Sequence, residues 1–264
     1  MKTLLNLLLM ALMGVGLVAG TASAKDDELL KDFVALEKVY IPALFYTNQG
    51  EVAAKPAMMA TAKFKKAWTL FADKYEFYRP DYANWGAYFA VIDPAVDEAL
   101  ELVNTKSLLQ AHEALEAVRA NMGELRGHNG FPKFIADQMT AYHGPMEHIV
   151  LSLKASGGKL TPALLAELAE TRDAAEKAWS KVEKCPVDTG LWGFSAGEMK
   201  KYYGMVDATG QALERFSAAL DAALASEKLT PELGKAVMAA GTLKLKMPFV
   251  ATYIFLGGLE LPQK

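Results

Sequence analysis

Cysteine is almost absent from this chain, since Cys185 is the only one among 264 residues. A single cysteine excludes an internal disulfide, and it also excludes the Cys-x-x-Cys-His motif that attaches c-type haem. Stability must therefore come from a hydrophobic core. A chain in which 52% of the residues are hydrophobic can supply one.

An excess of one charge and long apolar runs are also missing. The formal net charge is only −3, whereas a nucleic-acid-binding surface needs clustered basic residues. After the N-terminal segment, no apolar run approaches the roughly 20 residues of a membrane helix. We therefore expect neither a nucleic-acid partner nor a membrane span.

Two metalloenzyme motifs are absent as well. The sequence has no His-Glu-x-x-His zinc motif. It also lacks the paired Glu-x-x-His motifs that hold di-iron centres in four-helix bundles. These absences favour a binding or interaction protein over an enzyme.

The N-terminus has the layout of a cleaved secretory signal. Lys2 precedes an apolar stretch at residues 4–18, and small residues ending at Ala24 come before a charged segment. We therefore expect residues 1–24 to be a signal peptide that is removed after Ala24. The mature protein is expected to be soluble and periplasmic.

Helix start signals mark the rest of the chain. Thr161-Pro162 and Thr230-Pro231 each place a capping hydroxyl before a proline at the first helical position. Ser195 and Glu198 have the spacing of a capping box. Segments with the alternation of strands are absent, so the sequence predicts an all-α fold of eight helices. The expected ranges are 26–47, 55–78, 86–104, 106–126, 132–156, 162–183, 196–225 and 231–256.

A weak internal similarity divides these helices into two sets of four. Lys66-Ala67-Trp68 recurs as Lys177-Ala178-Trp179, and a glutamate precedes each at a nearly equal distance. The pattern predicts a helical bundle of two diverged four-helix units, at residues 25–130 and 131–264. This doubled layout resembles that of imelysin-like periplasmic proteins. Their Gly-x-His-x-x-Glu motif is missing here, so no family is assigned.

Two His-x-x-x-Glu spacings lie on the helices that flank the loop at 127–132. Residues four apart share a helix face, so His112 is paired with Glu116 and His143 with Glu147. Counted from the loop, His112 comes level with Glu147 in an antiparallel helix pair, and Glu116 with His143. Both pairs lie on the same flank of their hydrophobic seams, so they are expected to converge. Two imidazoles and two carboxylates suit a transition-metal ion such as Fe, Cu or Zn.

Neighbouring residues extend this predicted metal site. Arg119 is expected to orient a carboxylate ligand, and Met146 and Glu37 are alternative ligands. His128, in the loop, is expected to be exposed.

Three interpretations of these residues stay open. The first is a periplasmic metal-binding protein. The second is a helical interaction or scaffold module in which His, Glu and Arg form a structural network, since such charges often form ion pairs of little energetic value. The third is a non-covalent haem-binding protein with His and Met as axial ligands.

Overall fold

The structure of this chain is a computed structural model that describes residues 19–79, 84–131 and 133–261. The expected signal peptide falls mainly outside these residues, and only the helical backbone is described for residues 19–24. All regular structure in the described part of the chain is helical. None of the described helices is both long and apolar enough to cross a membrane.

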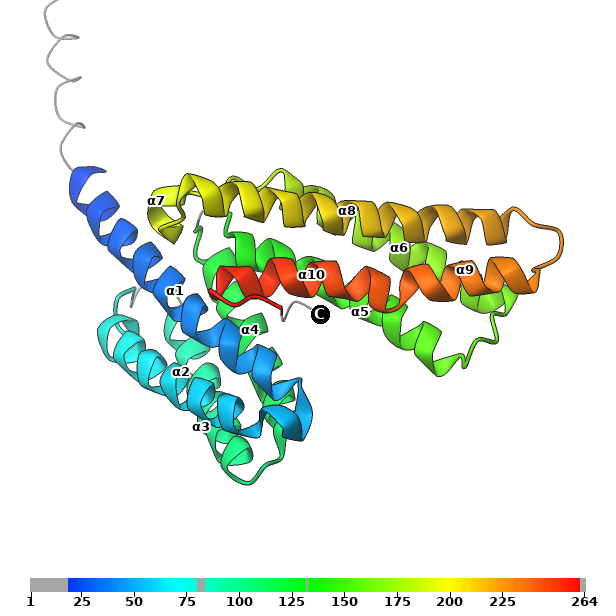
Figure 1. Ribbon diagram of the computed structural model, residues 1–264. Helices are drawn as coiled ribbons and strands as arrows, with labels where there is room; N and C mark the ends of the chain where they lie inside the picture. The colour runs from blue at the N-terminus through cyan, green and yellow to red at the C-terminus, as the bar shows by residue number, and fades with distance from the viewer. Residues whose placement is uncertain (1–18, 80–83, 132, 262–264) are drawn as a thin grey trace, which may run out of the picture.

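The first half of the chain forms one group of antiparallel helices, in which each packs against the next (Figure 1). A short 3₁₀ helix, η1, separates the first two helices. The group comprises α1 (Ala19–Thr47), η1 (Gly50–Ala53), α2 (Ala54–Tyr75), α3 (Trp85–Asn104) and α4 (Leu108–His128).

The second half forms a longer, narrower group (Figure 1). Its members are α5 (Ile135–Ala155), α6 (Pro162–Glu183), α7 (Thr189–Trp192), α8 (Ala196–Leu224), α9 (Pro231–Gly241) and α10 (Leu243–Leu256). Helix α10 packs against α8, α5 and α9, and it also reaches α1 of the first group. The internal duplication stays a prediction from the sequence.

Capping side chains set the helix starts that the sequence indicates. Thr161 Oγ1 accepts a hydrogen bond from the Leu164 amide at 3.2 Å, and Ser195 forms the expected capping box with Glu198. Ser195 also lies within Gly193–Gly197, which has the Gly-x-Ser-x-Gly spacing of a hydrolase nucleophile. That motif requires a strand before the turn, whereas here the serine hydroxyl caps α8, so the match does not indicate a nucleophile.

The expected helix at 231–256 is wrong as a single element, because the chain breaks at Thr242. The backbone angles of Thr242, φ −106° and ψ −118°, lie outside the helical region. The helix-like hydrophobic spacing continues across this position and suggests one helix, whereas Gly241 followed by Thr242 is a local sign of a helix end and a new start. The chain therefore forms two helices, α9 and α10, and α10 packs against α1.

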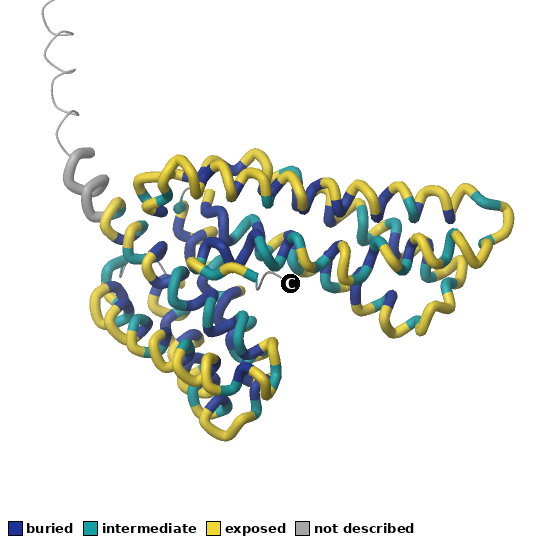
Figure 2. Tube along the Cα trace, viewed as in Figure 1, coloured by how far each residue is buried: buried dark blue, intermediate teal, exposed yellow. Residues whose placement is uncertain are grey.

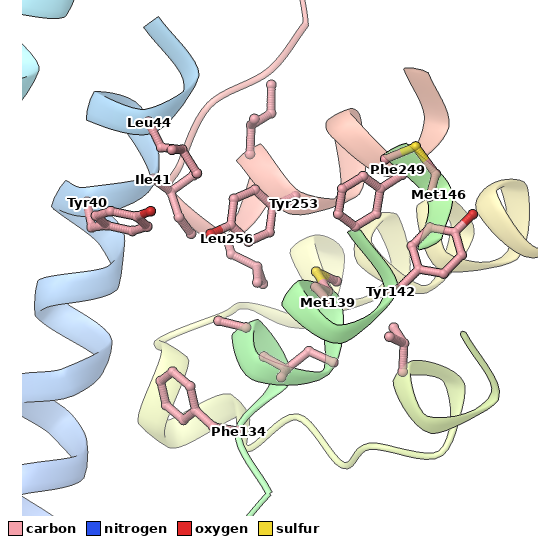
Figure 3. Packing of buried hydrophobic residues seen from close by; sticks show 14 of the residues in the cluster. Tyr40, Ile41, Leu44, Phe134, Met139, Tyr142, Met146, Phe249, Tyr253 and Leu256 are labelled. Carbon is pink, nitrogen blue, oxygen red and sulfur yellow. The ribbon is translucent and has the colours of Figure 1, made fainter. Parts of the chain in front are cut away.

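The hydrophobic core is continuous through both helix groups, and it is densest where they meet (Figure 2). Figure 3 shows the side chains at this junction. Leu44 from α1 lies across from Tyr253 and Phe249 of α10, and Met146 of α5 lies beside Phe249. Burying one such side chain stabilises the fold by about 1.5–3 kcal/mol. The two groups are therefore held together by apolar packing.

A buried ion cluster also joins the groups. Arg126 Nη2 of α4 donates to Glu37 Oε1 of α1 at 2.9 Å, and Arg126 Nε donates to Asp137 Oδ2 of α5 at 2.9 Å. The guanidinium lies over the rings of Phe33 and Phe134. Burial raises the pKa of Glu37, and Arg126 partly opposes that rise. The cluster fixes α1 and α5 to α4 at one point.

Candidate functional site

A pocket of about 140 Å³ lies between α1, α4, α5 and α10, and we call it the junction pocket. Asn48, Gln49 and Met247 on its rim are exposed to solvent. The ionisable side chains that line it are His112, Glu116, Arg119, His143, Lys246 and Tyr253. Its apolar wall includes Leu44, Phe45, Met146, Phe249, Val250 and Ile254.

His112 is held by the end of α1. Its Nδ1 lies 3.0 Å from the Leu44 carbonyl oxygen, which can only accept, so the proton is assigned to Nδ1. Nε2 is then an acceptor and lies 3.2 Å from Asn48 Nδ2. Burial lowers the pKa of His112 to about 4. The imidazole is therefore neutral at neutral pH.

His143 is held by Arg119. The Arg119 Nη2 group donates to His143 Nδ1 at 2.8 Å, and a guanidinium has no acceptor, so the His143 proton is assigned to Nε2. Burial, together with the positive charges of Arg119 and Lys246, lowers the pKa of His143 to about 3. This imidazole is also neutral at neutral pH.

Arg119 lies between two of the four predicted metal ligands, Glu116 and His143. It forms an ion pair with Glu116 as well as the hydrogen bond to His143. Its guanidinium therefore takes the place that a metal ion shared by these two side chains would need. In the described residues, no group of three His, Cys, Asp or Glu side chains could hold a metal ion.

The other predicted site residues lie in different places. Met146 lines the pocket, whereas Glu147 does not. The Oε2 atom of Glu147 lies 3.7 Å from His143 Nε2, which is too long for a hydrogen bond. Glu37 is paired with Arg126 in the buried ion cluster. His128, at the end of α4, is exposed.

Helix α10 supplies pocket residues that the sequence reasoning missed. Lys246, Val250 and Tyr253 follow the three- and four-residue spacing of one helix face, and all three line the pocket. The Tyr253 ring lies 5.9 Å from the Arg119 guanidinium, and burial raises the pKa of Tyr253. The spacing of α10 is visible in the sequence, but its contact with α4 depends on the break at Thr242.

The pocket carries more positive than negative charge. Arg119 and Lys246 are cationic, both imidazoles are neutral, and Glu116 is the one carboxylate among the described residues that line it. Burial raises the pKa of Glu116, while Arg119 opposes the rise. With Glu116 ionised, one positive charge is left unbalanced.

No family model, curated protein or solved structure matches this chain. What is known of its function therefore comes from the chemistry of the junction pocket. That chemistry combines a polar end with an apolar wall, which is the usual composition of a small-ligand site.

Proposed function

We propose that this protein binds a small ligand in the junction pocket. The observation that carries the proposal is the convergence of ionisable side chains from α4, α5 and α10 on one cavity. Burying such groups costs free energy, and proteins concentrate them at functional sites. A cavity of about 150 Å³ holds benzene, so the pocket suits a ligand of similar or slightly larger size. The expected signal peptide extends the proposal to a soluble periplasmic binding protein.

Filling the pocket should abolish ligand binding. Val250 is half-buried in the apolar wall, so in Val250→Trp the indole should occupy the cavity. We expect this variant to lose binding of benzene-sized organic molecules, measured by saturation-transfer NMR with a panel of neutral and charged compounds. Val91→Trp makes the same change on an exposed face of α3 and should bind like the wild type. A folded Val250→Trp protein that binds the panel normally would show that the pocket is not the binding site.

A transition-metal ion is a second candidate ligand, and the state of His112 favours it. Its Nδ1–H donates to a backbone carbonyl and leaves Nε2 unprotonated, as is usual for an imidazole that binds metal. Binding by His112, Glu116, His143 and Glu147 would require Arg119 to move away from Glu116 and His143. An iron, copper or zinc ion would also face the positive charge of Lys246.

If a metal is bound there, His112→Ala and His143→Ala should each remove most of the stabilisation by Zn²⁺, Cu²⁺ or Fe²⁺ in a thermal-shift titration. His128→Ala should leave it unchanged. Ligation requires neutral imidazoles. Because the pKa values of His112 and His143 are lowered to about 4 and about 3, imidazole protonation should not weaken binding until the pH approaches 4. Equal metal stabilisation of all four proteins would exclude this site.

A further inference from the structure

Two cationic groups at the junction pocket have unused hydrogen-bonding capacity. The Arg119 side chain is buried, and its Nε has no hydrogen-bond partner in the described part of the protein. Lys246 is half-buried at the pocket and forms no ion pair with any described carboxylate. A buried donor without an acceptor is costly. An anion in the pocket would balance the charges of both groups.

The apolar residues of the pocket determine which kind of anion fits. Phe249 and Val250 of α10, Leu44 of α1 and Met146 of α5 form an apolar wall beside the two cations. Figure 3 shows Phe249 and Met146 side by side, with Leu44 on the opposite helix. A bare inorganic anion would leave this wall unused. A ligand with an anionic end and a compact apolar body would contact both parts.

We propose that the ligand of the junction pocket is a small organic acid. Its carboxylate binds Arg119 and Lys246, and its apolar body packs against Phe249 and Val250. The planar guanidinium of arginine matches the geometry of a carboxylate, and a charged hydrogen bond is stronger than a neutral one. This inference rests on the proposed function and adds the chemical class of the ligand.

The charge of the pocket disfavours the alternatives. A cationic ligand would approach Arg119 and Lys246, and Glu116 is the one carboxylate among the described residues that line the pocket. A neutral ligand would use the apolar wall but would leave the Lys246 ammonium without a counter-charge. Ligands of the same shape but different charge therefore distinguish an anionic, a neutral and a cationic ligand.

Benzoate, benzamide and benzamidine provide that comparison, since they share one shape and carry a negative, zero and positive charge. Isothermal titration calorimetry at low salt should show benzoate binding roughly tenfold more tightly than benzamide, as expected for hydrogen bonds to a charged group. Benzamidine should bind most weakly. Hexanoate and hexanamide repeat the test with a flexible body.

Lys246→Met isolates the contribution of one cation, because methionine keeps much of the apolar stem. This variant should bind benzoate roughly tenfold more weakly than the wild type and benzamide equally well. Lys244→Met is the matched control, since Lys244 is exposed on the same helix and does not line the pocket. It should bind both compounds like the wild type.

The outcomes separate this inference from the proposed function. Equal affinity for the three aromatic compounds, tightest binding of benzamidine, or unchanged benzoate affinity in Lys246→Met would overturn the organic-acid assignment and leave a small-ligand pocket in place. Failure of all five compounds to bind the wild type would overturn both. Tighter benzoate binding that depends on Lys246 and not on Lys244 would support the inference.

Discussion

Arg126→Met should lower the free energy of unfolding by about 3–5 kcal/mol, the cost of removing one partner from a buried ion cluster. The guanidinium of Arg126 compensates the carboxylates of Glu37 and Asp137, and both Arg126 and Glu37 are almost completely buried. Methionine fills much of the same space but leaves the two carboxylates without their cation. Urea unfolding followed by circular dichroism would measure the change.

The pH dependence of this variant gives a second readout. Burial already raises the pKa of Glu37 with Arg126 present, and loss of the cation should raise it further. A carboxyl group whose folded-state pKa is raised destabilises the fold when it is ionised, so the defect of Arg126→Met should shrink as the pH falls.

Lys74→Met is the control, because Lys74 pairs with Glu28 and Asp32 on the surface. Such exposed pairs contribute at most about 1 kcal/mol. A similarly small cost for Arg126→Met would contradict the role of the buried cluster.

Gly241→Ala should destabilise the protein by about 1–3 kcal/mol, the usual cost of overpacking a core. A Cβ atom at this position would lie 2.6 Å from Phe216 Cε2 and would also collide with Leu153. Both neighbours are fully buried, so the added methyl group would have to displace core side chains. Thermal unfolding of the wild type and the variant would measure the loss.

Gly204→Ala makes the same substitution without a collision. Gly204 is exposed in α8, and nothing lies within 4 Å of an added Cβ atom. Alanine should therefore stabilise this helix by roughly 0.5–1 kcal/mol. If both alanine variants were stabilised alike, the close packing at Gly241 would be refuted.

Most helix positions could be predicted from the sequence, because caps and hydrophobic spacing are local signals. Thr161 and Ser195 begin their helices as predicted. The break at Thr242 was not predicted, because the hydrophobic spacing continues across it, although Gly241 and Thr242 are residue types that often end and begin helices. The contact of α10 with α1 follows from that break, and no local pattern encodes it.

The junction pocket could likewise be predicted only in part from the sequence. The four-residue spacing in α4 places His112 and Glu116 on one face, and the structure brings His143 to the same pocket. Spacing gives no information about side-chain direction between helices. It could not predict that Arg119 lies between Glu116 and His143, or that Lys246 of a helix distant in the sequence lines the same pocket.

Helix α4 attaches to its neighbours at two places on one face. Arg126 makes the first attachment through fixed charges, and Arg119, two helical turns away, borders the pocket that forms the second. The first attachment is made by ion pairs, and the second by the hydrogen bonds of His112 to Leu44 and of Arg119 to His143. A ligand in the junction pocket would therefore add contacts at the second place only, while the ion cluster holds the first place without it.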